Sequence, residues 1–531
     1  MPALRRPASS LAILGVTVWA LLIAPGMASA VPGDYLSVTD PLQWELRILE
    51  LYAPTAAGGR VRLPGVGSLP LRRAELMGTG EAMVPTFGPR AIALLRIERE
   101  LAHDATAEWN AAHVAGVTPR TWHSGGEDQG RIELSFAAEG AAALSSPFAD
   151  SRTRWRDGSG AHARIGAQVD RWLAYSHLWA GQLRGAERFT DALAKGTDLA
   201  LQTEESYLAY NGGARWGMMF GRNRWHWGPG DEASLLLSRT SAPLSGLMLH
   251  LRFESLRIDA TALHATLDVG SGEQLAAHRL EWQVRDGLRV GASETARYRS
   301  SGYQGVYLAS VIPFSLAQRL LDQDAGADTS GARRNNVMLG FDVAWRVADG
   351  TRVHGELLID DLHAESGDIP NKLGFQLGAE GVGDVHGARL SWGTEYTRLS
   401  RFVYTSFYGR TYAAQGAPIG FPTGPDSERL RARIAWDPEA SWQVAATASR
   451  TTRGESGLAN AFIPGTAVPD VWQLAGTPER ERRVEGGLRW WPSTGIDLAV
   501  HLARTWRENI AHVADADAAQ WDAGFAVRLT R

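Results

Sequence analysis

From about residue 126 onward, apolar and polar residues alternate over long stretches of the sequence. The clearest stretch is HRLEWQVRDGLRVGASETARYR at 278–299, where polar residues flank Leu280 and Trp282. An Asp-Gly pair at 286–287, typical of two-residue hairpin turns, interrupts the alternation, which then resumes in step. Because every second side chain of a strand lies on the same face, this pattern predicts antiparallel hairpins with one apolar and one polar face.

The same alternation recurs in GFDVAWRVADGTRVHGELLIDD (340–361), in RRVEGGLRWWPSTGIDLAVHLART (482–505) and in the final WDAGFAVRL (521–529). The predicted strands are roughly 9 to 11 residues long, which is the length that crosses a bilayer when tilted, whereas soluble strands are nearer 5 or 6. A soluble β-propeller is the alternative, but the sequence has no visible internal repeat of about 40 residues. Strand length therefore favours a transmembrane barrel.

The polar face of these strands points to the same architecture. An arginine on the lipid face costs roughly 2–4 kcal/mol at mid-depth, and the arginines here are separated from the apolar set. Trp490, Trp491 and Trp506 lie near predicted strand ends, as in aromatic girdles. About 400 residues, at roughly 22 per strand and connection, give about 18 strands. We predict an all-β chain that forms an antiparallel transmembrane β-barrel of the outer-membrane type over residues 126–531.

Residues 1–30 have the three parts of a secretory signal. Arg5 and Arg6 precede an apolar stretch, which ends near the small residues Ala28-Ser29-Ala30. We therefore expect a cleaved signal peptide, with an uncleaved N-terminal anchor as the alternative. The sequence contains no cysteine, so it can form no disulfide and carries no lipidated N-terminal cysteine.

Residues 31–125 follow a different period. Leu42, Leu46 and Leu49 are spaced for one face of a helix, and Ile92, Leu95 and Leu101 lie near one face of a second. Gly/Pro-containing turns separate these helices. The pattern predicts a small, mostly helical domain before the barrel.

Several functional classes lack support in the sequence. The net charge is −4 and there is no Lys/Arg-rich run, which argues against a nucleic-acid partner. The 14 histidines are scattered without a metal-ligand spacing, and neither a GxSxG elbow nor a GxGxxG motif hosted by a strand is present. We expect no metal site and no cofactor.

The segment GRNRWHWGPG (221–230) is the first candidate site. Tryptophan faces cover the apolar side of a sugar ring while charged groups bind hydroxyls or carboxylates, and the residues suited to this are Arg222, Arg224, Trp225 and Trp227. For each tryptophan, a membrane-interface or packing role is the alternative. Gly228, Pro229 and Gly230 predict a structural corner at which the strand turns.

Asp360-Asp361, at the end of ELLIDD, is the second candidate. Paired carboxylates can act in acid/base chemistry, but neighbours in a strand point to opposite faces, so a polar strand end is the simpler interpretation. Glu356 and Asp360 share the lumen-facing phase with Arg352 and His354, which predicts ion pairs inside the barrel.

Three stretches together resemble the capsule assembly Wzi family. These are ARWGMMFGRNRWHWGPGDEASLLLSRTSAPLSGLMLH (214–250), HGELLIDDLHAESGDIPNKLGFQLGAEG (354–381) and YTRLSRFVYTSFYG (396–409), in matching order and spacing. The resemblance implies an outer-membrane barrel of about 18 strands with a helical domain on the periplasmic side. It also implies a lectin role, in which the protein organises or attaches capsular polysaccharide without catalysis.

We therefore hypothesise a non-enzymatic barrel in the cell outer membrane, which contacts outer-membrane lipid and binds capsular or other surface polysaccharide. Its expected contact residues are those of the two candidate sites, and we expect a monomer. A porin-like oligosaccharide channel is the second hypothesis, motivated by the arginine-lined inner phase. A barrel-borne hydrolase that uses Asp360, Asp361 or Glu356 is the third.

Overall fold

The computed structural model describes most of residues 129–300 and 335–530, with a few short pieces outside these ranges. The predicted signal peptide lies outside the described residues, and so does most of the predicted helical domain at 31–125. The described pieces of that region are three helical residues, Arg47, Ile48 and Leu51, and the short strands β1 (Tyr35–Leu36), β2 (Ser68–Leu69), β3 (Leu71–Arg72) and β4 (Thr121–His123). Both domain assignments remain predictions.

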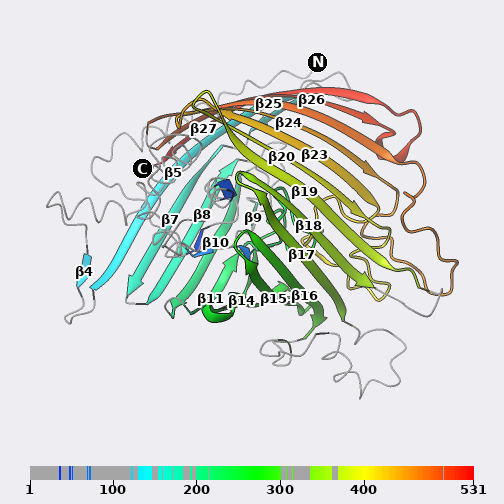
Figure 1. The fold of residues 1–531 in the computed structure, drawn as a ribbon, viewed down its shortest axis with the longest axis horizontal. Coiled ribbons are helices and arrows are strands. Elements are labelled where there is room, and N and C mark those ends of the chain that lie inside the picture. The colour runs from blue at the N-terminus through cyan, green and yellow to red at the C-terminus, as the bar shows by residue number, and fades with distance from the viewer. Residues whose placement is uncertain are drawn as a thin grey trace.

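Within the described residues, eighteen antiparallel strands close into a barrel, as the sequence predicts (Figure 1). They are β5 (Gln129–Ser145), β7 (Gly160–Val169), β8 (Trp172–Gln182), β10 (Leu199–Asn211), β11 (Trp216–Asn223), β13 (Leu244–Phe253), β14 (Ile258–Asp268), β15 (Glu273–Arg285), β16 (Leu288–Arg299), β17 (Asn336–Ala348), β18 (Thr351–Asp361), β19 (Lys372–Val385), β20 (Ala388–Leu399), β23 (Ser427–Asp437), β24 (Trp442–Arg453), β25 (Glu479–Ser493), β26 (Ile496–Glu508) and β27 (Ala518–Thr530). The last strand, β27, pairs with the first, β5, and this pairing closes the wall.

Short elements accompany the wall. They are β6 (Arg154–Asp157), β9 (Ala192–Leu193), β12 (His226–Trp227), β21 (Ala413–Ala414), β22 (Ala417–Pro418) and the 3-10 turns η2 (Glu254–Leu256) and η3 (Ile510–His512). No described helix is long and apolar enough to span a membrane.

The predicted hairpins form where their Asp-Gly pairs stand. β15 ends at Arg285 and β16 begins at Leu288, so Asp286 and Gly287 make the turn, and Gly287 has the positive φ of 80° that such a turn requires. The pair at 349–350 connects β17 to β18 in the same way.

The two faces of the wall divide as the alternation predicts. Leu280 and Trp282 of β15 point outward with 55% and 47% of their surface exposed, whereas Arg279 points inward and is 2% exposed. The polar phase therefore lines the interior and the apolar phase forms an outer belt, which is the arrangement that lipid demands.

The two ends of the barrel differ in their connections. Alternate hairpins close with tight turns, such as those at 286–287 and 386–387, while most of the others close with long connections, such as 224–243 and 400–426. In bacterial barrels the short turns face the periplasm and the long loops face outside. A hydrophobic cluster formed by these two long connections and the inward residues of the wall fills part of the interior.

Candidate functional site

Residues 224–243, the inward loop, leave the wall after β11 and enter the barrel before β13 begins. Inside, the β12 segment of this loop pairs with β2 of the N-terminal region, with His226 opposite Leu69. Leu235 and its neighbours pack against inward residues of several strands, among them Met338 of β17 and Leu358 of β18. The loop therefore connects the N-terminal region to the barrel wall.

The structure places Gly228, Pro229 and Gly230 at a bend of the inward loop, pressed against the wall. Gly228 has a φ of 140°, and a Cβ there would overlap the carboxylate of Glu356. A Cβ on Gly230 would overlap the backbone oxygen of Ala233. Glycine is needed at both positions because the backbone approaches its neighbours too closely for any side chain.

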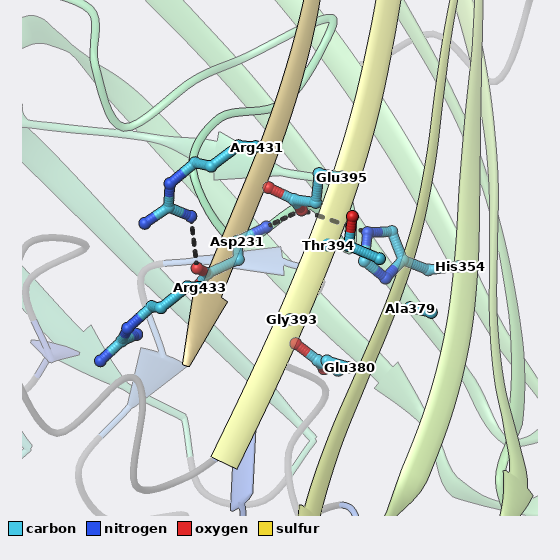
Figure 2. A pocket seen from close by; sticks show the side chains of 9 residues that line it. All are labelled: Asp231, His354, Ala379, Glu380, Gly393, Thr394, Glu395, Arg431 and Arg433. Atoms are coloured by element: carbon cyan, nitrogen blue, oxygen red, sulfur yellow. Dashed lines mark hydrogen bonds and ion pairs between the residues drawn. The ribbon is translucent and has the colours of Figure 1, made fainter. Parts of the chain in front are cut away.

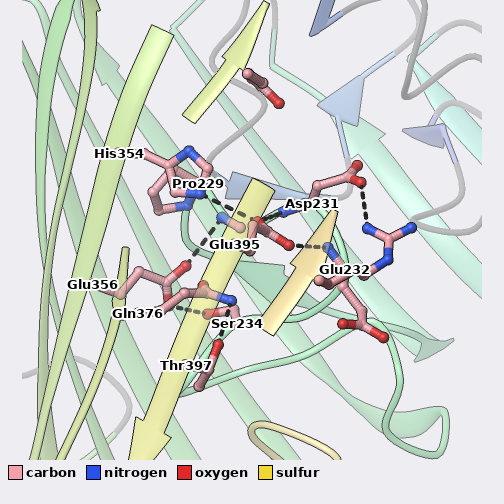
Figure 3. A network of polar contacts seen from close by, with 12 residues as sticks. Pro229, Asp231, Glu232, Ser234, His354, Glu356, Gln376, Glu395 and Thr397 are labelled. Atoms are coloured by element: carbon pink, nitrogen blue, oxygen red, sulfur yellow. Dashed lines mark hydrogen bonds and ion pairs between the residues drawn. The ribbon is translucent and has the colours of Figure 1, made fainter. Parts of the chain in front are cut away.

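Glu356 of β18 fixes this bend to the wall (Figure 3). Its Oε1 accepts a hydrogen bond from Gly230 N at 3.1 Å, and its Oε2 accepts from Leu235 N at 2.9 Å and Ser234 Oγ at 3.0 Å. One buried carboxylate thus satisfies two backbone N–H groups that would otherwise lack a partner inside the barrel, and it also contacts a hydroxyl.

Glu395 of β20 holds the next two residues of the loop. Its Oε1 accepts from Asp231 N at 2.5 Å, and its Oε2 accepts from Glu232 N at 3.2 Å. His354 Nε2 lies 3.2 Å from the same Oε1 (Figure 3). Two wall carboxylates therefore bind consecutive parts of one loop through its main chain.

The acidic side chains of the loop pair with arginines of β23. Arg429 donates to both oxygens of Glu232, at 2.8 and 2.6 Å, and Arg431 lies 3.0 Å from Asp231. Burial alone would raise the pKa of Asp231, but the surrounding arginines, Arg47 and Arg433 foremost, hold it below its ordinary value. Asp231 therefore stays charged, and both loop carboxylates are tied to the wall.

Arg47 reaches the same bend from the N-terminal region. Its Nη2 donates to the backbone oxygen of Pro229 at 2.7 Å and to Glu380 of β19 at 3.0 Å, and Nη1 donates to the oxygen of Gly230 at 3.3 Å. The side chain is 2% exposed. One arginine thus joins three parts of the chain that are far apart in sequence.

His226 fills the inner side of the bend. Its Nε2 lies 3.0 Å from the oxygen of Gly230, and its Nδ1 lies 3.4 Å from the backbone nitrogen of Arg239. A neutral imidazole with its proton on Nε2 suits both contacts. Burial, with smaller contributions from the nearby Arg239 and Arg47, lowers the pKa of His226 well below its ordinary value.

A small polar pocket lies beside these contacts (Figure 2). It is lined by Asp231, His354, Ala379, Glu380, Gly393, Thr394, Glu395, Arg431 and Arg433. Its polar side chains already contact one another, as Arg431 does with Asp231 and His354 with Glu395. The pocket is part of the network that anchors the inward loop.

The four predicted residues of the first candidate site have separate roles in the structure. Trp225 and Trp227 are 1% and 3% exposed and belong to the interior core, so they pack the inward loop. Arg222 donates through Nε to the backbone oxygen of Thr203 at 3.0 Å. Arg224 donates to the oxygen of Ser241 at 2.5 Å.

Asp360 and Asp361 end β18, where the register with β19 shifts between Ile359 and Asp361. Asp360 Oδ2 accepts from the backbone nitrogen of Tyr404 at 2.7 Å and holds the 400–426 connection. Asp361 is more open, with 41% of its side chain exposed, and pairs with Lys372 at 2.6 Å. The structure therefore does not bring this pair together with Arg222 and Arg224 through any contact among the described residues.

Glu356 and Asp360 are not spaced as a pair of glycosidase carboxylates. Glu356 and Asp360 are four residues apart on one strand, or about 13 Å along it, which exceeds the spacing of paired glycosidase carboxylates. Both oxygens of Glu356 are also occupied by donors of the loop. Among the described residues, no group of three or more acidic or histidine side chains could hold a metal ion.

Sequence reasoning missed Arg47, Glu395 and the β23 arginines. Glu395 and Arg431 occupy the polar phase of their strands, so alternation places them inside. Nothing in that periodicity identifies a loop as their partner. Arg47 lies in a segment whose helical pattern gives no sign of a contact with residues more than 180 positions away.

Comparison with known proteins gives the family. The sequence pattern of the family described as capsule assembly protein Wzi matches residues 153–520, more than half of the chain. Wzi of Escherichia coli, described as an outer membrane protein involved in group 1 capsule assembly and a carbohydrate-binding β-barrel, has a similar structure. The identity is 16% and the TM-score 0.62, over 93% of this chain and 99% of that one.

Two other outer-membrane proteins resemble this chain more weakly. OprD of Pseudomonas aeruginosa has 11% identity and a TM-score of 0.42, over 75% of this chain and 95% of its own. The channel DcaP of Acinetobacter baumannii has 10% identity and a TM-score of 0.38, over 76% and 97%. None of the curated proteins compared with the sequence matches it. From the match over residues 153–520, the chain belongs to the capsule assembly protein Wzi family.

Proposed function

We propose that this protein binds capsular or other surface polysaccharide at the outer membrane and helps to hold that polymer at the cell surface. The family and the description of the Escherichia coli relative as a carbohydrate-binding barrel support this role. The observation that carries it is the anchored inward loop, which occupies interior space along β18, β19 and β20. Other long connections, such as 454–478, then remain as the surface that a polymer can reach.

The predicted contact residues divide by exposure. Asp361, with 41% of its side chain exposed, would contact polymer directly, and so would the half-buried Arg222 and Arg224. Trp225, Trp227 and Asp360 would act by fixing the two long connections. The protein would act without catalysis, because the carboxylates that could serve a hydrolase are engaged in anchoring.

The test is retention of polymer by the purified full-length protein. Immobilised protein should retain acidic polysaccharide extracted from the surface of its own cells, and a deletion strain should shed that polymer into the medium. If neither occurs, the proposal fails. Conductance in planar bilayers separates the porin-like alternative, since an interior held by the inward loop predicts little or no open-channel current.

A further inference from the structure

Four arginines lie close together on the membrane-facing surface near the long-loop end of the barrel. This outer arginine cluster consists of Arg450 on β24, Arg480 and Arg482 on β25, and Arg504 on β26. All four belong to the outward phase of their strands. Arg450 pairs in register with Leu430, and Arg504 with Val484, whose side chains are 48% and 51% exposed.

The cluster carries more positive charge than its neighbours compensate. Arg450 and Arg482 stand directly opposite each other across β24 and β25, and like charges at such a position destabilise a sheet. Glu508 lies 2.9 Å from Arg482 and 3.7 Å from Arg480. No acidic side chain of the described residues lies within ion-pair distance of Arg450 or Arg504.

The depth of the cluster matches a headgroup region. Trp442 and Trp490 stack at the short-turn end with ring centroids 5.0 Å apart, and Arg450 and Arg482 lie eight residues from them along their strands. Eight residues of a tilted strand rise about 20 Å, while the apolar band of such barrels is about 25 Å tall. Long arginine side chains cover the remaining distance, so the guanidinium groups reach the upper edge of the band.

Neighbouring tryptophans hold one member of the cluster in place. The guanidinium carbon of Arg504 lies 4.7 Å from the ring centroid of Trp521 and 5.4 Å from that of Trp506. These rings are 46% and 40% exposed and lie where an aromatic girdle meets headgroups. The contacts fix the planar donor group before any ligand binds.

We propose that the outer arginine cluster binds the phosphate groups of a phosphorylated glycolipid in the outer leaflet. Guanidinium groups donate paired hydrogen bonds to phosphate, and the single carboxylate of Glu508 leaves Arg450 and Arg504 without an acidic partner among the described residues. The acyl chains of such a lipid would lie on the apolar belt below. This site is independent of the polysaccharide-binding role.

The test compares lipid retention by full-length protein and by the double variant R450Q/R482Q. Each protein is reconstituted in phosphatidylcholine vesicles that contain either bisphosphorylated lipid A or its dephosphorylated form, and the lipid that stays bound after extraction is quantified. The wild type should retain the phosphorylated lipid selectively. The double variant should bind it about 30-fold more weakly, as expected for the loss of two arginines at a membrane surface.

The control is R257Q/R285Q, which removes two arginines at the short-turn end and should retain lipid as the wild type does. Heat-modifiable gel migration verifies that each variant is folded. Equal retention by R450Q/R482Q and wild type would overturn the proposal. Equal retention of both lipids by the wild type would also overturn it. So would a double variant that retains the phosphorylated lipid normally but loses affinity for lipid-free acidic polysaccharide.

Discussion

At the scale of single residues, the bend of the inward loop depends on the absence of side chains. Gly228 and Gly230 lie against Glu356, Ala233 and Gln376 so closely that a methyl group would displace the backbone. The same closeness lets wall carboxylates accept bonds from the main chain of the loop. The glycines are therefore required for the anchoring bonds.

The variant Gly230→Ala tests this requirement. We expect it to lower the free energy of unfolding by about 1–3 kcal/mol, because the added Cβ overlaps the backbone oxygen of Ala233. The measurement is the urea concentration at which the folded gel band disappears. Gly383→Ala in β19 is the matched control, since a Cβ there meets nothing within 4 Å. Equal midpoints for the two variants would contradict the interpretation.

His226 makes the stability of the folded protein depend on pH. Its pKa in the folded protein is lowered by burial, so below about pH 6.5 the unfolded chain takes up a proton that the folded loop does not. Stability from this group is therefore complete above that pH and declines as pH falls, by about 2 kcal/mol between pH 7 and pH 5. Urea unfolding at both pH values should show this decline, and His226→Gln should reduce it. An unchanged decline in the variant would exclude this histidine.

At the scale of elements, the periodicity of the sequence predicts the wall but not the inward loop. Alternation assigns Leu280 and Trp282 to one face, and the Asp-Gly pairs mark the turns. Both predictions succeed because they depend only on local backbone geometry. The loop depends on contacts between distant residues, such as Arg429 with Glu232. Trp225 and Trp227 have the composition of a sugar site, yet their surroundings make them core residues.

Arg47→Ala tests the connection between the N-terminal region and the loop. Glu380 loses one of its arginine partners and the backbone oxygen of Pro229 loses this donor, while the oxygen of Gly230 keeps only its contact with His226. We expect a loss of about 3 kcal/mol in the free energy of unfolding. The exposed Arg257→Ala, whose partner Asp286 is also exposed, should cost less than about 1 kcal/mol. Similar urea midpoints for both variants would show that Arg47 does not hold the loop.

At the scale of the whole molecule, the length of the chain and its period of two predict a closed barrel of about 18 strands, and the structure confirms it. This succeeds because lipid leaves few alternatives to a closed sheet. No comparable rule predicts which segments of the chain fill the barrel interior. This depends on which long connection turns inward and which wall residues receive it, as Glu356 and Glu395 do here.

The predicted export signal is also tested on the whole protein. Cleavage after Ala30 predicts that the protein purified from outer membranes begins at Val31. Mass spectrometry of the intact protein should give the mass of residues 31–531. A mass that includes the first thirty residues would show an uncleaved anchor instead.

The pairing of β5 with β27 has a consequence for biogenesis. Asp522 of β27 stands opposite Ser145 of β5, so the two edges of the sheet lie near opposite ends of the chain. The seam cannot form until the last strand has been synthesised, and until then both edges expose unpaired backbone groups that can recruit other strands. Closure of this seam is therefore the step that removes the last free edges of the sheet.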